Sequence, residues 1–350
     1  MKNRQIKTKK EYFIVGTRPE IIKVAPILLK LDRSEYYLVH TGQHCELAVV
    51  MYNLFGITPD IDLNLMEENQ TLESFLSKAI VELDKIVKKH DFKRIWVHGD
   101  TSTALAGAIV AFTNKIELVH NEAGLRSFDK NNPFPEEIFR TLIDRMSDIL
   151  FAPTQRSVEN LKKENISGRI HLVGNTIVDA LEMMKDKLPK ERPIKEKYVL
   201  ATVHRRESFG NDIYEIFKAL KELSKTIKVV IPAHPNPNVQ KVIKDLEVET
   251  VQPMNYIDFL WHMRDCEYII SDSGGLQEEA PSFNKKIIVL RKTTERQEAI
   301  EKGYAILVPV LEKNFILDKI EEFISGDQIE MHNPFGNGKT TEKIIKILNL

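Results

Sequence analysis

The sequence of 350 residues has little of three things: net charge, cysteine and long apolar runs. Its 50 basic residues against 51 acidic residues leave a formal charge of −1, which gives no sign of the basic surface typical of nucleic-acid binding. No apolar run approaches the roughly 18 residues needed to cross a bilayer, and the basic first ten residues lack the apolar stretch of a secretory signal. Cys45 and Cys266 lie far apart and match no metal-binding spacing, so we expect a reduced, cytoplasmic protein without a membrane segment or a nucleic-acid partner.

What the chain does contain is a regular alternation of short β-rich runs with helical patterns. Apolar residues make up 42% of the sequence, which is enough for buried cores and argues against disorder. The runs that predict strands fall at residues 12–16, 36–40, 94–98, 117–120, 149–152, 170–173, 198–203, 228–231, 268–271 and 286–290. Helical patterns separate most of them, for example after Pro19 and over residues 71–90. The alternation predicts an α/β fold built on parallel sheets with helices on both faces.

A charged, proline-containing stretch at residues 185–197 interrupts this alternation and is typical of a linker. We therefore predict one Rossmann-like domain over residues 1–184 and a second over residues 198–335. Residues 336–350 end in a helical pattern. Two such halves predict a ligand-binding cleft between them, because strand ends and helix N-termini of open parallel sheets face their ligands.

Polar residues cluster directly after the predicted strands, which is where open parallel sheets bind ligands. After the first strand, Arg18 lies at the start of a helix and Lys23 follows about one turn later, so both could meet an anion held at that helix N-terminus. A turn with solvated charges explains the same residues equally well. Asp100 follows the strand at residues 94–98 and suits either chemistry or an ordinary helix N-cap.

Glu122 follows directly on an apolar strand, and Glu136 opens a helix after a proline-rich loop. Together with Asp100 they make three carboxylates, which we expect at one edge of the sheet. Proton transfer on two faces of a substrate needs that number of acids and bases. The structural alternative is that an acid in a first helical turn often serves only the helix dipole. A metal site is the alternative, because period-two spacing places His98 with Asp100 and His120 with Glu122 on common faces. No defined metal-site motif fits, so acid–base chemistry is favoured and no metal is predicted.

In the second half, residues 271–279 place a Ser-Gly-Gly turn between a predicted strand and a helix. The free N–H groups of such a turn can hold a phosphate, and Glu279, about one turn further on, could reach a ribose; a plain turn is the structural alternative. Arg296 belongs to a cationic segment after the next strand, and His204 and His234 follow earlier strands. Neither a P-loop nor a GxGxxG fingerprint is present, which argues against ATP hydrolysis and against a conventional NAD site.

Seven segments together resemble one family, in the same order from Gly16 to beyond Arg296: GTRPEIIK, HGDT, NEAGLRS, PFPEE, TVHRRES, SDSGGLQEEAPS and RKTTERQEA. They are similar to the non-hydrolysing UDP-N-acetylglucosamine (UDP-GlcNAc) 2-epimerases, and the similarity covers nearly the whole chain. The resemblance implies a fold like that of GT-B glycosyltransferases, with the active site in the interdomain cleft and the C-terminal helix, within residues 336–350, packed back on the N-terminal domain. It also implies a homodimer that interconverts UDP-GlcNAc and UDP-ManNAc without a cofactor.

The resemblance also implies a mechanism, because C2 of the sugar is not next to a carbonyl and simple deprotonation would be too slow. Anti elimination of UDP gives a 2-acetamidoglucal intermediate, and re-addition of UDP and a proton gives the epimer. The residues implied as catalytic are Asp100, Glu122, Glu136, Lys23 and His204. Those implied in substrate binding are Arg18, Ser273, Gly274, Gly275 and Arg296 at the diphosphate, Glu279 at the ribose and Phe259 near the uracil.

A regulatory UDP-GlcNAc site of the bacterial members is only partly matched. The resemblance assigns Gln43, His44, Arg206 and His234 to that site, and all four are present. The arginine expected just before the QTL segment is absent, because Glu68 and Asn69 precede Gln70. This departure puts allosteric activation of the bacterial kind in doubt.

Three other functions compete with this prediction. A hydrolysing 2-epimerase would share the same groups and release free ManNAc and UDP. A GT-B glycosyltransferase using UDP-GlcNAc is disfavoured by the three clustered carboxylates. A catalytically inactive nucleotide-sugar sensor is disfavoured by the complete set of acids and bases.

Overall fold

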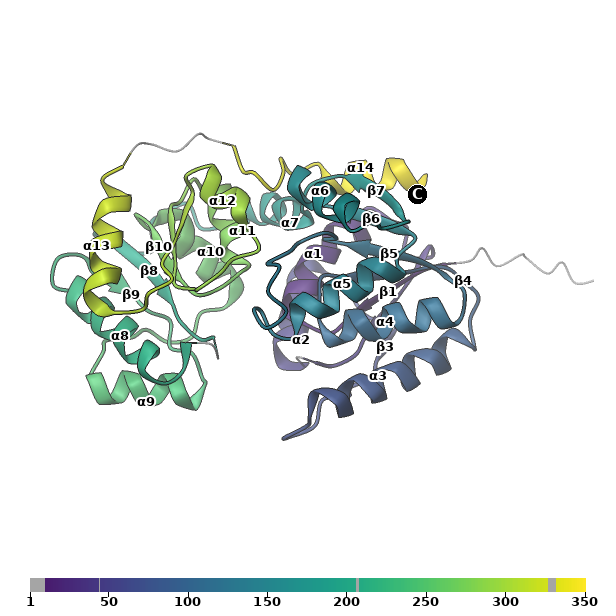
Figure 1. The fold of residues 1–350 in the computed structure, drawn as a ribbon, viewed down its shortest axis with the longest axis horizontal. Helices are drawn as coiled ribbons and strands as arrows, with labels where there is room; N and C mark the ends of the chain where they lie inside the picture. Colours follow the sequence, from purple (N-terminus) through teal and green to yellow (C-terminus); the bar gives the residue numbers. More distant parts are fainter. Residues whose placement is uncertain (1–9, 44, 206–207, 327–331) are drawn as a thin grey trace, which may run out of the picture. The chain divides into compact units, whose positions relative to one another are not determined.

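The computed structural model describes residues 10–43, 45–205, 208–326 and 332–350, and the chain forms two compact units (Figure 1). The first unit comprises Met1–Ala180 together with Gly336–Leu350, and the second comprises Leu181–Phe335. Each unit has a parallel sheet of its own with helices packed on it, which confirms the predicted α/β class with two Rossmann-like domains. Within the described ranges, none of the helices is long and apolar enough to cross a membrane.

The first sheet has the strand order β3-β2-β1-β4-β5-β6-β7, and all its neighbouring strands are parallel. The chain runs from β1 to one edge and then returns to β4, so the direction of winding reverses between β1 and β4. Sheets of this kind bind their ligands at the carboxyl ends of the strands near that reversal. The strands are β1 (Lys10–Val15), β2 (Tyr36–His40), β3 (Ile61–Asp62), β4 (Phe92–His98), β5 (Glu117–Asn121), β6 (Ile149–Ala152) and β7 (Arg169–Leu172).

Three helices of the first unit pack side by side: α3 (Leu72–Val87), α4 (Ser102–Thr113) and α5 (Glu136–Met146). Their apolar residues share one core with Tyr12 and Ile14 of β1. Because side chains alternate along a strand, Phe13 points to the opposite face of the sheet, where its ring stacks on Trp96 with centroids 4.8 Å apart. The other helices that precede the second unit are α1 (Arg18–Leu28), α2 (Cys45–Phe55), α6 (Gln155–Lys163) and α7 (Thr176–Lys185).

The C-terminal helix α14 (Thr340–Leu348) belongs to the first unit, although it is far in sequence from the rest of that unit. Its first backbone amides are held by a carboxylate of α7, since Thr340 N and Thr341 N donate to the two oxygens of Asp179 over 3.2 and 2.7 Å. Lys343 Nζ donates to the carbonyl of Val173 over 3.1 Å. A negative charge at a helix N-terminus satisfies amides that have no partner within the helix and complements its dipole.

The second unit has a smaller sheet in the order β12-β11-β10-β8-β9, again with parallel neighbours. Its strands are β8 (Tyr198–Thr202), β9 (Lys228–Val230), β10 (Ile269–Ser271), β11 (Ile287–Val289) and β12 (Ala305–Leu307). Its helices are α8 (Asn211–Leu223), α9 (Pro237–Leu246), α10 (Tyr256–Asp265), α11 (Leu276–Glu279), α12 (Gln297–Glu301) and α13 (Lys313–Ile324), with a 3₁₀ turn at Ala280–Phe283.

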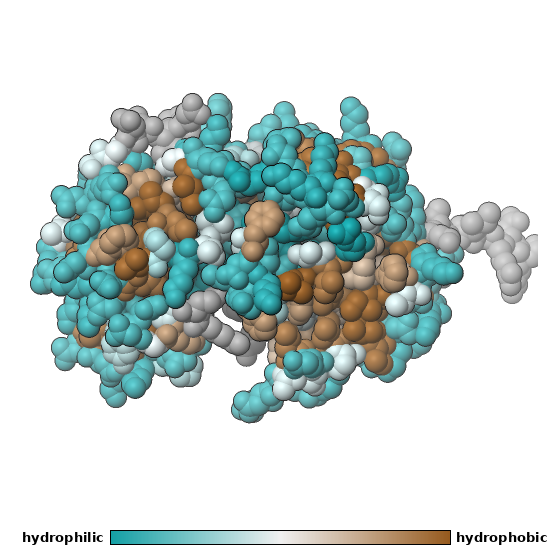
Figure 2. All heavy atoms as spheres, viewed as in Figure 1, coloured by the Kyte–Doolittle hydropathy of each residue, from teal (hydrophilic) through white to brown (hydrophobic). Residues whose placement is uncertain are grey.

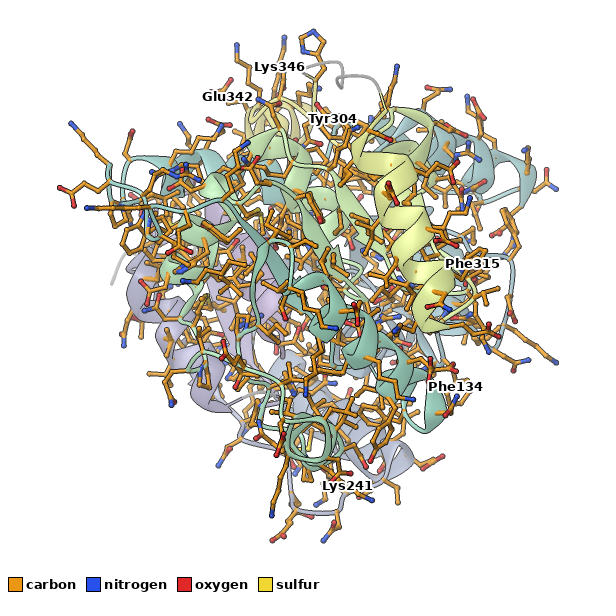
Figure 3. The ribbon with its side chains drawn as sticks, turned by 90° about the vertical axis from the view of Figure 1, so that its left-hand side faces the viewer. Phe134, Lys241, Tyr304, Phe315, Glu342 and Lys346 are labelled. Atoms are coloured by element: carbon orange, nitrogen blue, oxygen red, sulfur yellow. The ribbon has the colours of Figure 1, made fainter. Side chains whose placement is uncertain are left out.

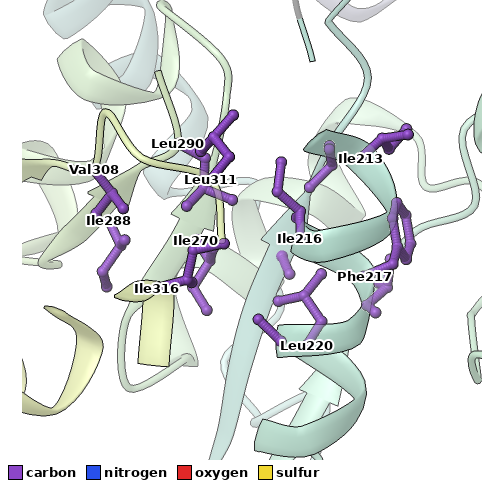
Figure 4. Packing of buried hydrophobic residues seen from close by; sticks show 14 of the residues in the cluster. Ile213, Ile216, Phe217, Leu220, Ile270, Ile288, Leu290, Val308, Leu311 and Ile316 are labelled. Carbon is purple, nitrogen blue, oxygen red and sulfur yellow. The ribbon is translucent and has the colours of Figure 1, made fainter. Parts of the chain in front are cut away.

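The core of the second unit joins α8 to the sheet and to α13. Figure 4 shows Ile216, Phe217 and Leu220 of α8 together with Ile270 of β10 and Ile316 of α13 in one cluster of buried apolar residues. Phe315 of α13 packs partly buried against the same core, whereas Lys241 lies on the exposed side of α9 (Figure 3). This core fixes the ends of β8 and β10, from which the polar segments of the unit project.

Candidate functional site

A buried ion pair lies at the carboxyl ends of the first sheet's strands. Lys23 of α1 pairs through Nζ with Glu122 Oε2 just after β5, and both side chains are only 7% exposed. Asn175 Nδ2 donates to the same oxygen over 2.8 Å. Glu122 has a φ of +71°, a left-handed conformation that costs a non-glycine residue on the order of 1 kcal/mol or more. The fold therefore holds the Glu122 carboxylate, on a strained backbone, beside a positive charge and away from water.

His98, at the end of β4, completes the surroundings of Glu122. Its Nδ1 lies 3.1 Å from Asn121 Nδ2, which can only donate, so the ring proton is on Nε2, 3.4 Å from Glu122 Oε2. Burial lowers the pKa of His98, and the interaction with Glu122 offsets this only in part. His98 is thus a neutral donor toward the carboxylate.

Asp100 follows β4 and is held by a helix that begins 36 residues later in the chain. Arg140 of α5 is buried, and its Nη2 lies 2.6 Å from Asp100 Oδ2. Its Nη1 lies 3.5 Å from Glu137, whose carboxylate accepts hydrogen bonds from Ser127 N and Phe128 N. Glu136 opens α5 one turn before Arg140 and is half-buried. Arg140 therefore links Asp100 to the loop that follows Glu122.

Glu20 ties the two turns that carry Arg18 and Asp100. It accepts hydrogen bonds from Gly16 N and Thr17 N over 2.9 and 2.7 Å, and from Thr101 Oγ1 over 2.8 Å. Burial raises the pKa of Glu20 to about 7, even though these hydrogen bonds pull it the other way. Arg18 begins α1 and is half-buried beside this turn.

The second unit has an arginine cluster next to the Ser-Gly-Gly turn. Arg296 is buried, donates through Nε to Glu278 Oε1 over 2.8 Å and pairs with Glu295, and Arg291 Nη1 lies 3.3 Å from Glu295 Oε2. A Cβ at residue 274 would lie 2.9 Å from Arg296 Nη1, so glycine at this position lets the guanidinium approach the backbone. The cluster can present positive charge to an anion at the turn.

The four other residues of the second unit that were predicted to bind substrate are all half-buried. Ser273 is half-buried after β10, and its N–H donates to Ser271 Oγ over 2.9 Å, so this amide is not free as the sequence had suggested. Gly275 precedes α11, Glu279 ends it half-buried, and Phe259 is half-buried on α10.

His204, after β8, packs against His234 and Asp272. The two imidazole rings stack with centroids 5.0 Å apart, and His204 Nδ1 lies 3.3 Å from Asp272 Oδ1. The fully buried Asp272 also accepts hydrogen bonds from His204 N and Arg205 N over 2.8 and 2.7 Å. This carboxylate joins the turn after β8 to the turn after β10.

Of the residues implied in regulation, His44 and Arg206 lie outside the described residues. Gln43 is in the first unit, where its Oε1 accepts a hydrogen bond from Thr103 Oγ1 over 3.1 Å. His234 is in the second unit, beside His204.

The histidines and carboxylates considered as a metal site have other partners. His120 pairs with Asp144, His98 faces Glu122, and Glu122 pairs with Lys23. Over the part of the chain that is described, no group of three or more His, Cys, Asp or Glu residues has an arrangement suited to a metal ion. The left-handed backbone at Glu122 ends the period-two alternation of β5, which is why His120 and Glu122 do not share partners.

Three side chains that hold the predicted catalytic residues were not predicted from the sequence. Arg140, Asn175 and Asp272 were not assigned, although each contacts a predicted catalytic residue. Asn175 follows β7 and could have been found by the same rule that selected residues after the other strands. Arg140 lies inside a helix, where an arginine has no distinguishing signal.

Comparison with known proteins identifies the family. A family model described as UDP-N-acetylglucosamine 2-epimerase matches residues 29–349. The chain belongs to the UDP-N-acetylglucosamine 2-epimerase family. A curated UDP-N-acetylglucosamine 2-epimerase from Campylobacter jejuni is 40% identical over 375 residues, with 97% of each chain covered. This confirms the family predicted from the seven segments.

Solved structures agree with this membership. UDP-GlcNAc 2-epimerase from Neisseria meningitidis, bound to UDP-GlcNAc, matches with a TM-score of 0.89 and 36% identity over 97% of this chain and 99% of that one. The enzyme from Methanocaldococcus jannaschii, in complex with UDP-GlcNAc and UDP, matches with a TM-score of 0.87 and 34% identity over the same shares. Family members therefore share the GT-B-like fold over the whole chain.

Proposed function

We propose that the protein interconverts UDP-GlcNAc and UDP-ManNAc by inverting C2 of the sugar, without hydrolysis. The observation that carries this proposal is the buried Lys23–Glu122 pair, with Asp100 and Arg140 at the neighbouring strand end. Membership of the 2-epimerase family supports the reaction class, and relatives solved with UDP-GlcNAc and with UDP support the substrate.

In the proposed reaction, a carboxylate removes the proton from C2 while the C1–O bond to UDP breaks and UDP leaves with the bonding electrons. The product is 2-acetamidoglucal, in which C2 has lost its stereochemistry. UDP then adds back to C1 while a second acid delivers a proton to the opposite face of C2. Acids and bases on both faces of the sugar are therefore required.

The first unit offers these groups. Lys23 pairs with Glu122 and Asn175 donates a hydrogen bond to it, and these contacts fix the direction of its carboxylate. Asp100 lies beside the Arg140 guanidinium, and Glu136 opens the helix that carries Arg140. We assign Asp100, Glu122, Glu136 and Lys23 of the first unit to catalysis, and His204 of the second unit as well.

The second unit offers the groups that hold UDP. Ser273, Gly274, Gly275 and Arg296 suit the diphosphate, whose negative charge grows as the C1–O bond breaks and which an arginine stabilises best at that moment. We assign Arg18 of the first unit to the same diphosphate, Glu279 to the ribose and Phe259 to the uracil. None of these steps needs a metal or a redox cofactor.

We also propose that the protein is a homodimer. Figure 2 shows apolar residues gathered on the face of the first unit where α4 and α5 lie in Figure 1. Phe112 of α4 is 65% exposed, and Val81 of α3 and Ile138 and Leu142 of α5 are exposed as well. Exposed apolar patches of this kind mark protein interfaces. Sedimentation of the native chain and of Leu142→Glu should give a dimer and a monomer respectively.

Proton NMR with UDP-GlcNAc in deuterated water tests the proposed reaction. We expect a growing UDP-ManNAc signal with deuterium at C2, and free ManNAc with UDP would identify the hydrolysing reaction instead. An unchanged spectrum would contradict both. Glu122→Gln should slow turnover about 100- to 10,000-fold, whereas Glu117→Gln, at the opposite end of β5 beside Arg169, should not.

A further inference from the structure

His120 is a completely buried histidine that the proposed reaction does not use. It lies on β5, two residues before Glu122, and its side chain is 0% exposed. Its Nδ1 lies 2.6 Å from Asp144 Oδ1, and its Nε2 lies 2.8 Å from the carbonyl oxygen of Gly99. Both ring nitrogens therefore face oxygen atoms at hydrogen-bond distance.

The nature of these oxygens decides where the ring protons are. A backbone carbonyl can only accept, so Nε2 must carry a proton. Asp144 is held ionised independently of His120, because its Oδ2 lies 2.8 Å from the Arg126 Nη2 cation and accepts a hydrogen bond from Gly124 N over 3.2 Å. An ionised carboxylate also only accepts, so Nδ1 must carry a proton too. A neutral ring would turn a lone pair toward one of the two oxygens.

The charge of such an imidazolium is balanced within a buried network. Asp144 Oδ2 lies 2.8 Å from Arg126 Nη2, and Arg126 donates through Nε and Nη2 to Glu164, over 2.7 Å each. The network thus contains two positive and two negative groups, and buried charges persist only when they are paired in this way. His98 is a further titratable group that faces His120, and the charge of His120 helps to lower the pKa of His98.

The network also contacts the backbone of both predicted catalytic turns. His120 holds the carbonyl of Gly99, directly before Asp100, and Gly99 has a φ of +64°. Asp144 Oδ2 accepts from Gly124 N, two residues after Glu122, over 3.2 Å. One ion pair therefore joins the turns that follow β4 and β5.

We propose that His120 is a positioning residue with a proton on both ring nitrogens, whose ion pair with Asp144 fixes the turns that carry Asp100 and Glu122. The positioning role rests on the proposed epimerase reaction, whereas the protonation state does not. His120 and His98 lie on the paired strands β5 and β4 and thus differ in charge. His120 is a cation that holds a backbone carbonyl, whereas His98 is a neutral donor to a carboxylate.

Nitrogen-15 NMR of the native full-length chain tests the protonation state. With labelled histidine, both ring nitrogens of His120, assigned through the neighbouring backbone, should have shifts of protonated nitrogen at pH 7. His98 should show the mixed pair of a neutral ring in the same spectra. One unprotonated ring nitrogen in His120 at pH 7 would overturn the proposal, whether or not the protein is an epimerase.

Kinetics of His120→Gln tests the positioning role. Glutamine keeps an amide donor but lacks the charge, so we expect kcat to fall about 10- to 100-fold while KM changes little, as misplaced catalytic groups produce. His171→Gln, a half-buried histidine on β7, is the matched control and should keep its kcat. If His120 acts through Asp144, adding Asp144→Asn should lower kcat no further.

The outcomes separate this proposal from the proposed function. A native chain that epimerises, with a folded His120→Gln variant of unchanged kcat, would overturn the positioning role and leave the reaction standing. A native chain without epimerase activity would remove the reaction, and the NMR result would still decide the protonation state. If His120→Gln does not fold, Asp144→Asn alone should show the same selective loss of kcat, and an unchanged kcat there would overturn the role.

Discussion

Arg140 Nη2 lies 2.6 Å from Asp100 Oδ2, and this contact ties helix α5 to the end of β4. The same guanidinium lies 3.5 Å from Glu137, so it holds two carboxylates in fixed directions. We predict that Arg140→Lys lowers kcat for UDP-GlcNAc about 10- to 100-fold, because lysine keeps the charge but loses the planar fork. Steady-state kinetics measures this effect. Arg145→Lys, on the same helix but exposed, is the control, and equal kcat values in the two variants would show that the fork at Arg140 is unimportant.

The contact between Gly274 and Arg296 leads to a prediction about UDP binding. Gly274→Ala places a methyl group 2.9 Å from Arg296 Nη1, so the Arg296 guanidinium must move, whereas the distance of 3.5 Å to Arg291 Nη1 is an ordinary contact. Overpacking of this kind costs about 1–3 kcal/mol, and we expect UDP to bind roughly 10- to 100-fold more weakly. Isothermal titration calorimetry measures the affinity for UDP. The control is Gly326→Ala, where the added methyl group makes only ordinary contacts at 3.5 Å or more. Native-like affinity in Gly274→Ala would argue against a diphosphate at this turn.

The carboxylate of Asp179 anchors the last helix of the chain. It accepts hydrogen bonds from Thr340 N and Thr341 N at the start of α14. Asp179→Ala should lower the free energy of unfolding by about 1–2 kcal/mol, as loss of a helix cap does. Urea unfolding measures the change. Glu182→Ala, on the same helix, removes only an exposed pair with Lys185 and should cost less than about 0.5 kcal/mol; a similar loss in both variants would count against an anchoring role.

Sequence patterns predicted the described strands other than β3 and β12. The observed β1, β2, β4 and β5 all overlap predicted runs, because four or more apolar and β-branched residues stand out. The strand β3 has only two residues, which is too few for a periodicity. The strand β12 has three residues, as do β9, β10 and β11, but it was not among the predicted runs. Helix α9 was not among the predicted helices, although Pro237 is at its first position and Asn236 caps it.

The candidate site was predictable residue by residue but not pair by pair. Asp100 and Glu122 each follow a strand, and that position alone marks them. Their partners Arg140 and Asn175 come from segments 40 and 53 residues further along the chain, and only the packing of α5 and α7 brings them together. The left-handed φ of Glu122 has no signal in the sequence. The period-two alternation that suggested a metal site was therefore extended to Glu122, although β5 ends at Asn121.

Glu20 predicts a pH dependence of stability in the acid to neutral range. Its pKa is about 7 in the folded protein, against 4.5 for an ordinary glutamate, because burial disfavours the charged carboxylate. Between these values the folded state binds more protons than the unfolded state, so the free energy of unfolding decreases as pH rises. The stabilisation is complete below about pH 4.5 and is lost as pH rises through about 7; a shift of this size corresponds to about 3 kcal/mol.

Glu20→Gln isolates this contribution, because glutamine resembles the neutral acid at every pH and its carbonyl can still accept from Gly16 N and Thr17 N. Urea unfolding of both proteins between pH 5 and pH 8 gives the difference in unfolding free energy, in which the titrations common to both proteins cancel. We expect the native chain to lose stability relative to Glu20→Gln up to about pH 7 and then to remain at a constant difference. The exposed Glu35, which also accepts a backbone hydrogen bond at 2.9 Å, provides the control Glu35→Gln, since its ionisation needs no desolvation. A difference for Glu20→Gln that stays constant with pH, or that changes in the opposite direction, would show that the hydrogen bonds from the two turns outweigh burial and keep Glu20 ionised.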